Sequence, residues 1–291
     1  MSHWQQLKLS ASSADADALA EALTRVGALS VTFEDAADNP ILEPPPGTTP
    51  LWSYTRVVGL FEPDVDLAAV TAAMQASFPG GFSYEITELP EQDWVRKWMD
   101  DFKPLHFGGR LWVCPSWLPP PDPNGLNILL DPGLAFGTGT HASTALMLRW
   151  LATQDLSNQT VIDYGCGSGI LAIAAAKLGA KIVYAVDHDH QAILATTDNA
   201  NKNGVGAQIK CVAPTQLPEK TADLILANIL AEPLIELAPR FATLVKPGGK
   251  IVLAGLLTSQ SQRVLGAYEP LTQLVEEATE GEWHLICVQA H

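Results

Sequence analysis

The stretch Val161-Ile162-Asp163-Tyr164-Gly165-Cys166-Gly167-Ser168-Gly169-Ile170-Leu171 decides how this sequence is interpreted, because an apolar strand runs into a glycine turn and then into a helix. Glycine has no Cβ, so such a turn lets a ligand approach the backbone closely. The next apolar strand is followed by Asp187, whose carboxylate would lie at the same sheet edge and can accept hydrogen bonds from ribose hydroxyls. The strand, the turn and the acid together predict a nucleoside-binding site.

The nucleoside is not expected to be NAD. The dinucleotide pattern G-x-G-x-x-G requires glycine at position 170, where this chain has Ile170, and the observed pattern is D-x-G-x-G-x-G. The run Asp187-His188-Asp189-His190 contains metal-ligand residue types, but successive side chains at a strand end point in different directions. No second cluster with ligand spacing is visible in the sequence, so no metal is expected.

Two further segments are candidates for the same site. Leu130–Thr144 mixes glycine and proline with hydroxyl side chains, which predicts a ligand loop, with Phe136 and Thr138 toward the cofactor. We expect Ser143 or Thr144 to cap the helix that follows this loop. Asn228 ends an apolar strand, where its carbonyl could accept from an amine and its amide could donate to a cofactor, although a plain helix cap is the alternative.

The C-terminal part of the chain, residues 108–291, alternates apolar strands with helical segments. Continuous apolar strands between helices predict a parallel sheet covered on both faces, a doubly wound Rossmann-like α/β fold. The strands expected in this sheet are Val161–Asp163, Ile182–Val186, Leu224–Ala227 and Ile251–Ala254, with Arg110–Cys114 and Leu126–Leu130 before them. The last two segments, Leu274–Glu277 and Trp283–Gln289, predict an antiparallel edge.

The N-terminal part, residues 1–88, shows the order β-α-β-β-α-β, which is that of a small ferredoxin-like α+β domain. Its first helix is expected to be capped by Ser13 and its second to follow Asp66. Residues 89–107 are interpreted as a linker helix, because Trp94, Trp98 and Phe102 are spaced along one helix face. Packing would explain these aromatic residues, and a substrate-gripping surface is the alternative.

Composition limits the partners of the chain. It has 291 residues, 47% of them hydrophobic, which is enough for two globular domains. The formal net charge of −15 disfavours direct nucleic-acid binding. The same charge would attract a basic partner, or it could serve solubility alone.

The four cysteines form no C-x-x-C pair, so neither a zinc site nor a disulfide framework is suggested, and reduced thiols in a cytoplasm fit best. No apolar run approaches the ~18 residues of a membrane span, and no export signal is visible at the N-terminus. We therefore expect a cytoplasmic protein with no membrane contact, and a monomer.

The sequence resembles one family, the bacterial PrmA-type methyltransferases that modify the large-subunit ribosomal protein number eleven. The resemblance covers essentially the whole chain, and the Pro132–His141 loop and the tryptophan-bearing segments are its most specific parts. It is carried by Asp93-Trp94-Val95-Arg96-Lys97-Trp98-Met99, Arg110-Leu111-Trp112-Val113-Cys114-Pro115-Ser116-Trp117, Leu130–Thr144, Asp163–Leu171 and Asn228-Ile229-Leu230-Ala231. Two departures are Ala142-Ser143, where Pro-Thr is usual, and Tyr164, where Val is frequent.

The resemblance implies S-adenosylmethionine as the cofactor, with contacts at Thr144, Gly165, Asp187 and Asn228. Gly167 is expected to make room for the cofactor beside Gly165. The resemblance also implies that the N-terminal domain captures the ribosomal protein and swings relative to the catalytic domain, and that lysine ε-amines and the α-amine are methylated. We expect Asn228 to orient the amine; no general base can be named.

Three alternatives remain open from sequence. The same chemistry could act on another basic protein or on a small amine. An NAD-dependent oxidoreductase is opposed by Ile170 and by the lack of a hydride-transfer constellation. A binding module that kept the fold without turnover is the third alternative.

Overall fold

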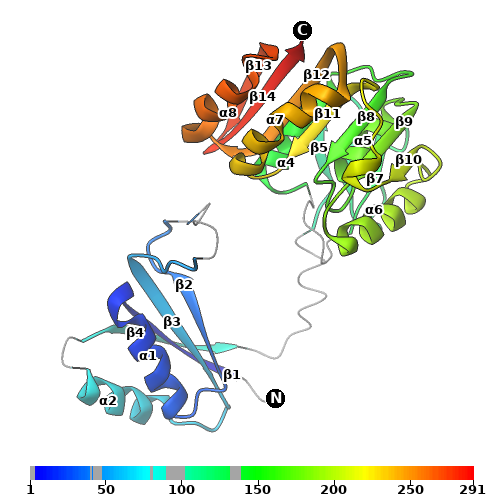
Figure 1. The fold of residues 1–291 in the computed structure, drawn as a ribbon. Coiled ribbons are helices and arrows are strands. Elements are labelled where there is room, and N and C mark those ends of the chain that lie inside the picture. The colour runs from blue at the N-terminus through cyan, green and yellow to red at the C-terminus, as the bar shows by residue number, and fades with distance from the viewer. Residues whose placement is uncertain (1–3, 40, 42–47, 79–80, 90–101, 132–138) are drawn as a thin grey trace. The chain divides into compact units, whose positions relative to one another are not determined.

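The structure is a computed structural model that describes residues 4–39, 41, 48–78, 81–89, 102–131 and 139–291 (Figure 1). Contacts divide the chain into two compact units, Met1–Met99 and Asp100–His291, and each is described by itself. Trp94 and Trp98 of the expected linker helix lie outside the described residues. In the described part of the chain, no helix is long and apolar enough to cross a membrane.

The first unit has the ferredoxin-like architecture that the element order predicted. Its sheet has the strand order β2-β3-β1-β4, and every neighbouring pair is antiparallel. Its elements are β1 (Trp4–Ser12), α1 (Ser13–Arg25), β2 (Ser30–Asp35), β3 (Tyr54–Phe61), α2 (Leu67–Ser77) and β4 (Ser83–Leu89).

One face of this sheet forms the core of the unit. Leu7 and Leu9 alternate with polar residues along β1 and pack with Leu19 of α1 and Met74 of α2, as the period of a half-buried strand requires. The predicted cap at Ser13 was wrong by one residue. The helix begins at Ser13 and its N-cap is Ser12, whose Oγ donates to Asp15 Oδ2 at 2.7 Å.

The second unit is built around a seven-stranded sheet of order β10-β9-β8-β11-β12-β14-β13. The neighbours from β10 to β12 are parallel, whereas β14 and β13 are antiparallel, so the expected antiparallel edge is confirmed. The strands are β8 (Thr160–Tyr164), β9 (Ile182–Val186), β10 (Ile209–Cys211), β11 (Ala222–Asn228), β12 (Val245–Leu257), β13 (Thr272–Glu280) and β14 (Trp283–Ala290).

Helices cover both faces of this sheet, as a doubly wound fold requires. They are α4 (Ala142–Ala152), α5 (Ile170–Lys177), α6 (His190–Lys202), α7 (Ala231–Leu244) and α8 (Ser261–Tyr268). Neighbouring residues of a strand face opposite sides, so Val161 of β8 joins the core with α4 and α5, while Ile162 joins the core with α7 and α8. The apolar strands predicted from sequence are therefore buried on both faces.

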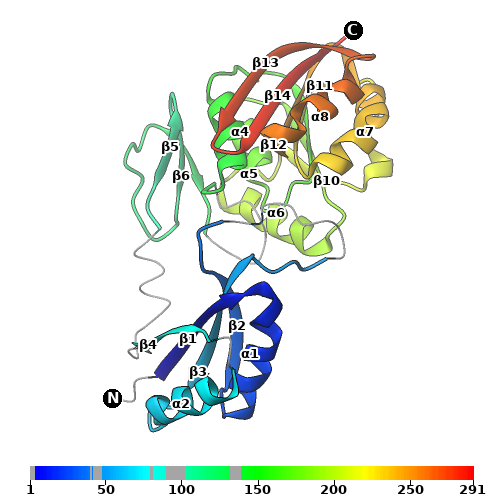
Figure 2. The ribbon, with the colours of Figure 1, turned by 90° about the vertical axis from the view of Figure 1, so that its left-hand side faces the viewer.

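A separate three-stranded sheet, β5 (Leu105–Gly108), β6 (Leu111–Cys114) and β7 (Leu126–Leu129), packs on α4 and α5 (Figure 2). Strand β5 was not predicted, and it occupies the end of the range 89–107 that was interpreted as helix. Strands β6 and β7 are parallel to each other. The edge of β7 is held by Asn203, whose amide accepts from Leu129 N at 2.7 Å and donates to Leu129 O at 2.8 Å.

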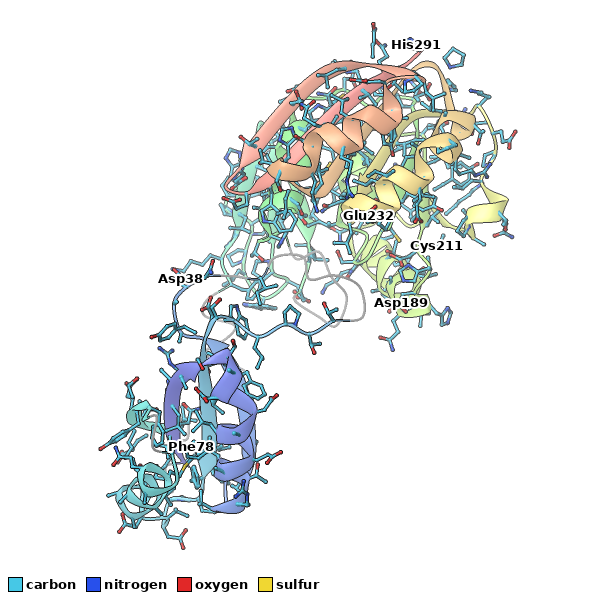
Figure 3. The ribbon with its side chains drawn as sticks, turned by 60° about the vertical axis from the view of Figure 1, so that its left-hand side comes forward. Asp38, Phe78, Asp189, Cys211, Glu232 and His291 are labelled. Atoms are coloured by element: carbon cyan, nitrogen blue, oxygen red, sulfur yellow. The ribbon has the colours of Figure 1, made fainter. Side chains whose placement is uncertain are left out.

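The strand order of the main sheet reverses between β8 and β11. From β8 the chain moves outward through β9 and β10, then returns to the other side of β8 as β11. Open α/β sheets bind ligands outside the carboxyl ends of the strands at such a switch point. Figure 3 marks this edge with Asp189, Cys211 and Glu232, which follow or end β9, β10 and β11, and it shows His291 at the opposite edge.

Candidate active site

The glycine turn lies directly after β8, at the switch point of the sheet. Gly165, Gly167 and Gly169 have φ values of +81°, +53° and +81°, a region that strongly favours glycine. A Cβ at Gly165 would stand 2.3 Å from Ile229 Cγ2, and one at Gly169 would stand 2.9 Å from Thr196 Oγ1. Close packing within the protein therefore requires these two glycines, in addition to the room for a ligand that the sequence suggested.

Asp187 lies where the sequence predicted, at the carboxyl end of β9. Its Oδ2 accepts from Gly167 N at 2.9 Å and its Oδ1 accepts from Asp189 N at 3.0 Å, so the carboxylate ties the end of β9 to the glycine turn. Its side chain is 9% exposed. Each carboxylate oxygen has more than one acceptor position, so both can accept further hydrogen bonds from a ligand.

Two side chains of α6 hold the same turn from the other side, and the sequence analysis missed both. Thr196 Oγ1 donates to Gly167 O at 3.0 Å, and Asn199 Nδ2 donates to Ser168 O at 2.9 Å. The two residues are three apart, so they share one face of the helix. This spacing in the helix after Asp187 was the available sequence signal.

Asp163 is the most deeply buried charged group of the site. It lies on β8, is 1% exposed, and accepts through Oδ2 from Ala172 N at 2.9 Å, which caps the first turn of α5. Among the described residues its Oδ1 has no hydrogen-bond partner. Burial, and to a smaller extent the nearby Asp187 carboxylate, raise the pKa of Asp163 to about 7, although the hydrogen bond from the Ala172 N–H lowers it.

Thr144 and Asn228 are brought together, as two residues of one predicted site should be. Thr144 is buried in the first turn of α4, and its Oγ1 accepts from Asn228 Nδ2 at 3.1 Å. The other end of this amide, Asn228 Oδ1, is buried with no partner among the described residues. An unpaired buried acceptor costs about 1–3 kcal/mol, so this oxygen is a candidate for receiving a ligand N–H.

The loop before α4 is described only in part. Phe136 and Thr138 lie outside the described residues. The predicted capping of α4 by Ser143 or Thr144 was wrong, because the N-cap is His141, whose Nδ1 accepts from Ser143 N at 3.4 Å. The His141 ring also packs edge-on against Trp283, with centroids 4.5 Å apart.

Other sequence features have structural explanations. Asp189 is the N-cap of α6 and accepts from Gln191 N at 2.8 Å. Within the described part of the chain, no group of three His, Cys, Asp or Glu side chains could hold a metal ion. Tyr164, one of the two departures from the family pattern, packs against Phe241 of α7 with ring centroids 5.2 Å apart.

Known proteins resemble this chain over nearly its whole length. A family model described as ribosomal protein L11 methyltransferase (PrmA) matches residues 3–291. Proteins named ribosomal protein L11 methyltransferase are 53% identical in Nitrosococcus oceani, covering 91% of both chains, and 51% identical in a Shewanella species, covering 96% of this chain and 97% of that one. The crystal structure of ribosomal protein L11 methylase from Lactobacillus delbrueckii subsp. bulgaricus has a TM-score of 0.59 at 33% identity, over 65% of this chain and all of that one.

The buried Asp163 carboxyl predicts a pH-dependent stability. Its pKa is about 7 in the folded protein and about 3.9 in the unfolded chain, so the protonated carboxyl stabilises the fold fully below the unfolded pKa. This stabilisation declines as the pH rises above the unfolded value and is lost once the pH has passed the folded pKa of about 7. Asp163→Asn removes this titration and keeps an acceptor for Ala172 N. We therefore expect the variant to gain stability relative to the unsubstituted protein as the pH rises. The difference between their free energies of unfolding, measured by urea denaturation, should shift in favour of the variant by about 2–3 kcal/mol between about pH 5 and pH 8. Parallel pH profiles for the two proteins would contradict the raised pKa.

Proposed function

The chain belongs to the PrmA family of ribosomal protein L11 methyltransferases, and from this membership we propose that it is an S-adenosylmethionine-dependent N-methyltransferase whose substrate is ribosomal protein L11. The methylated groups in this proposal are lysine ε-amines and the N-terminal α-amine. The observation that carries it is the meeting of Asp187, the glycine turn and Asn228 at one switch point of the sheet.

The site residues fit S-adenosylmethionine. Asp187 has acceptor positions left for the two ribose hydroxyls, while Gly165 and Gly167 keep side chains away from the turn that would face the nucleoside. Asn228 Oδ1 is a buried acceptor without a described partner. Thr144 completes this set, and Phe136 and Thr138 are proposed as further contacts from the loop before α4. When bound, the cofactor would supply a methyl group on a sulfonium, whose carbon a nucleophile can attack in line with the departing thioether sulfur.

The protein's contribution to such a displacement is alignment. In our proposal Asn228 Oδ1 accepts a hydrogen bond from the substrate amine and so directs the nitrogen lone pair toward the methyl group. A lysine amine has a pKa of about 10.4 and must be neutral to attack, which a poorly hydrated pocket favours. No side chain among the described residues is assigned as general base, and water can take the released proton.

We assign substrate capture to the N-terminal unit and methyl transfer to residues 108–291, joined by the segment 89–107. The net charge of −15 supports a lysine-bearing partner, because long-range attraction raises the rate of encounter. A ribosomal protein is made in the cytoplasm, where the four cysteines, all free in the structure, would remain reduced. We propose no nucleic-acid contact, and a monomeric enzyme.

Asp187→Ala should weaken binding of S-adenosylhomocysteine, the product form of the cofactor, by at least about 100-fold in isothermal titration calorimetry. The reason is the loss of charge-assisted hydrogen bonds to the ribose, each worth about 1.5–3 kcal/mol. Asp189→Ala is the matched control, since this exposed acid lies two residues away and caps α6. Unchanged affinity in Asp187→Ala would remove this carboxylate from the site.

Incubating the enzyme with S-adenosylmethionine and purified L11 should add methyl groups to L11, seen as mass increments in intact-protein mass spectrometry. Fragmentation should place them on lysine side chains and on the N-terminal amine. If L11 stays unmodified while labelled cofactor marks another protein or a small amine in a cell extract, the substrate assignment is wrong and the chemistry is retained. No labelled product of any kind would leave only the binding-module alternative.

Deleting residues 1–88 should abolish methylation of L11 and leave S-adenosylhomocysteine binding within about threefold of the full chain, because the proposed cofactor contacts all lie in the second unit. Calorimetry on the truncated protein provides the folding control. Full methyltransferase activity after the deletion would contradict substrate capture by the N-terminal unit.

A further inference from the structure

Gly255, near the carboxyl end of β12, has a left-handed backbone conformation that no sequence motif predicted. Its φ is +80°, and it lies within an irregular stretch of β12, where the pairing register with β14 shifts between Leu253 and Leu256. A Cβ at this position would stand 2.6 Å from Ile229 O, 2.9 Å from Ile229 N and 2.9 Å from Asn228 Oδ1. Two of these three atoms belong to backbone that a neighbouring strand holds, so they have little freedom to move.

The residue after Asn228 is enclosed by glycines on two sides. Ile229 Cγ2 lies where a side chain at Gly165 would begin, at 2.3 Å from that Cβ position. The Ile229 backbone lies against Gly255 and donates from its N–H to Ala254 O at 3.2 Å. The end of β11 is therefore seated between the glycine turn after β8 and the irregular end of β12.

The Asn228 amide is held by a hydrogen bond at one end and lies beside Gly255 at the other. Thr144 Oγ1 accepts from Nδ2, and Oδ1 lies on the side of Gly255. A side chain at position 255 would occupy the space beside Oδ1 and would push the Asn228–Ile229 backbone away from β12. Protein interiors are close-packed, so a displacement of the Asn228–Ile229 backbone would also move the residues that pack against it.

We infer that Gly255 is a positioning residue for methyl transfer, acting through Asn228 and Ile229. The second part of the arrangement is the contact of Ile229 Cγ2 with Gly165, and the two glycines together form what we call the seat of Ile229. This inference rests on the proposed function, because it deepens the role given there to Asn228. It assigns no contact between Gly255 and cofactor or substrate. Its effect is on the placement of the amide that receives the amine.

The decisive variant is Gly255→Ala, compared with Gly248→Ala. Both glycines lie on β12 with left-handed φ values of +80° and +74°, but a Cβ at Gly248 would meet nothing within 4 Å. The control therefore carries the same type of backbone strain without the collision. We expect Gly255→Ala to lower kcat for L11 methylation at least about tenfold, since misplacement near 1 Å can cost about a hundredfold. Gly248→Ala should stay within about twofold of the unsubstituted enzyme.

Cofactor affinity separates positioning from general damage. Gly255 takes no part in the hydrogen bonds of Asp187 and of the glycine turn, so the affinity for S-adenosylhomocysteine should change less than kcat, by no more than about threefold in calorimetry. A double-mutant cycle with Asn228→Ala is the second readout. If Gly255 acts through the amide, adding Gly255→Ala to Asn228→Ala should change kcat by less than about twofold.

A second pair of variants keeps the inference testable if Gly255→Ala does not fold. Ile229→Val retains the Cγ2 methyl that faces Gly165, whereas Ile229→Leu has the same number of carbons and lacks the branch at Cβ. Ile229→Leu should lower kcat at least about fivefold with cofactor affinity retained, and Ile229→Val should not. The inference is overturned if Gly255→Ala matches Gly248→Ala, if the two effects of the cycle multiply, or if both Ile229 variants behave alike.

These outcomes are separable from failure of the proposed function. If the unsubstituted enzyme does not methylate L11, the function is wrong. The seat is then tested by the side-chain amide NMR signals of Asn228, which should shift in Gly255→Ala and stay in place in Gly248→Ala. If the unsubstituted enzyme methylates L11 and Gly255→Ala is equally active, the inference alone is wrong.

Discussion

The site depends on one constraint, that a parallel sheet buried on both faces has no place for polar side chains except at the ends of its strands. Strands β9 and β11 are apolar along most of their length, and the polar groups Asp187 and Asn228 come where these two strands end. Because the strand order reverses beside β8, these ends lie next to one another at one edge. The same rule explains why Asp163, inside β8, is an exception with a strongly raised pKa.

Hydrogen bonds hold the strand ends at this edge in place. Asp187 joins β9 to the turn after β8, two residues of α6 hold the carbonyls of that turn, and Asn228 joins β11 to α4. Asp187, Thr196 and Asn199 share the glycine turn as their partner, so a change at one of these three is expected to alter the others. The chemistry proposed for the site needs this rigidity, since alignment is its main requirement.

The parts that could be predicted from sequence are those with a local pattern. Apolar strands, the glycine turn and Asp187 follow from residue type and spacing, and they were placed correctly. Strands β5 and β10 were missed because four and three residues leave no periodicity to detect. The cap of α4 was assigned wrongly because a histidine takes a role that serine or threonine usually has. Gly255 could not be found, because its requirement comes from a neighbouring strand distant in sequence.

The amide of Asn203 has a consequence beyond holding β7 to α6. An edge strand exposes N–H and C=O groups that can template the addition of a strand from another chain, and this is a common route to aggregation. Asn203 offers Leu129 one acceptor and one donor, as the peptide group of an adjoining strand would. A single side chain at the end of α6 therefore occupies the backbone groups of β7 at Leu129. At this residue the edge strand cannot pair with a strand from another chain.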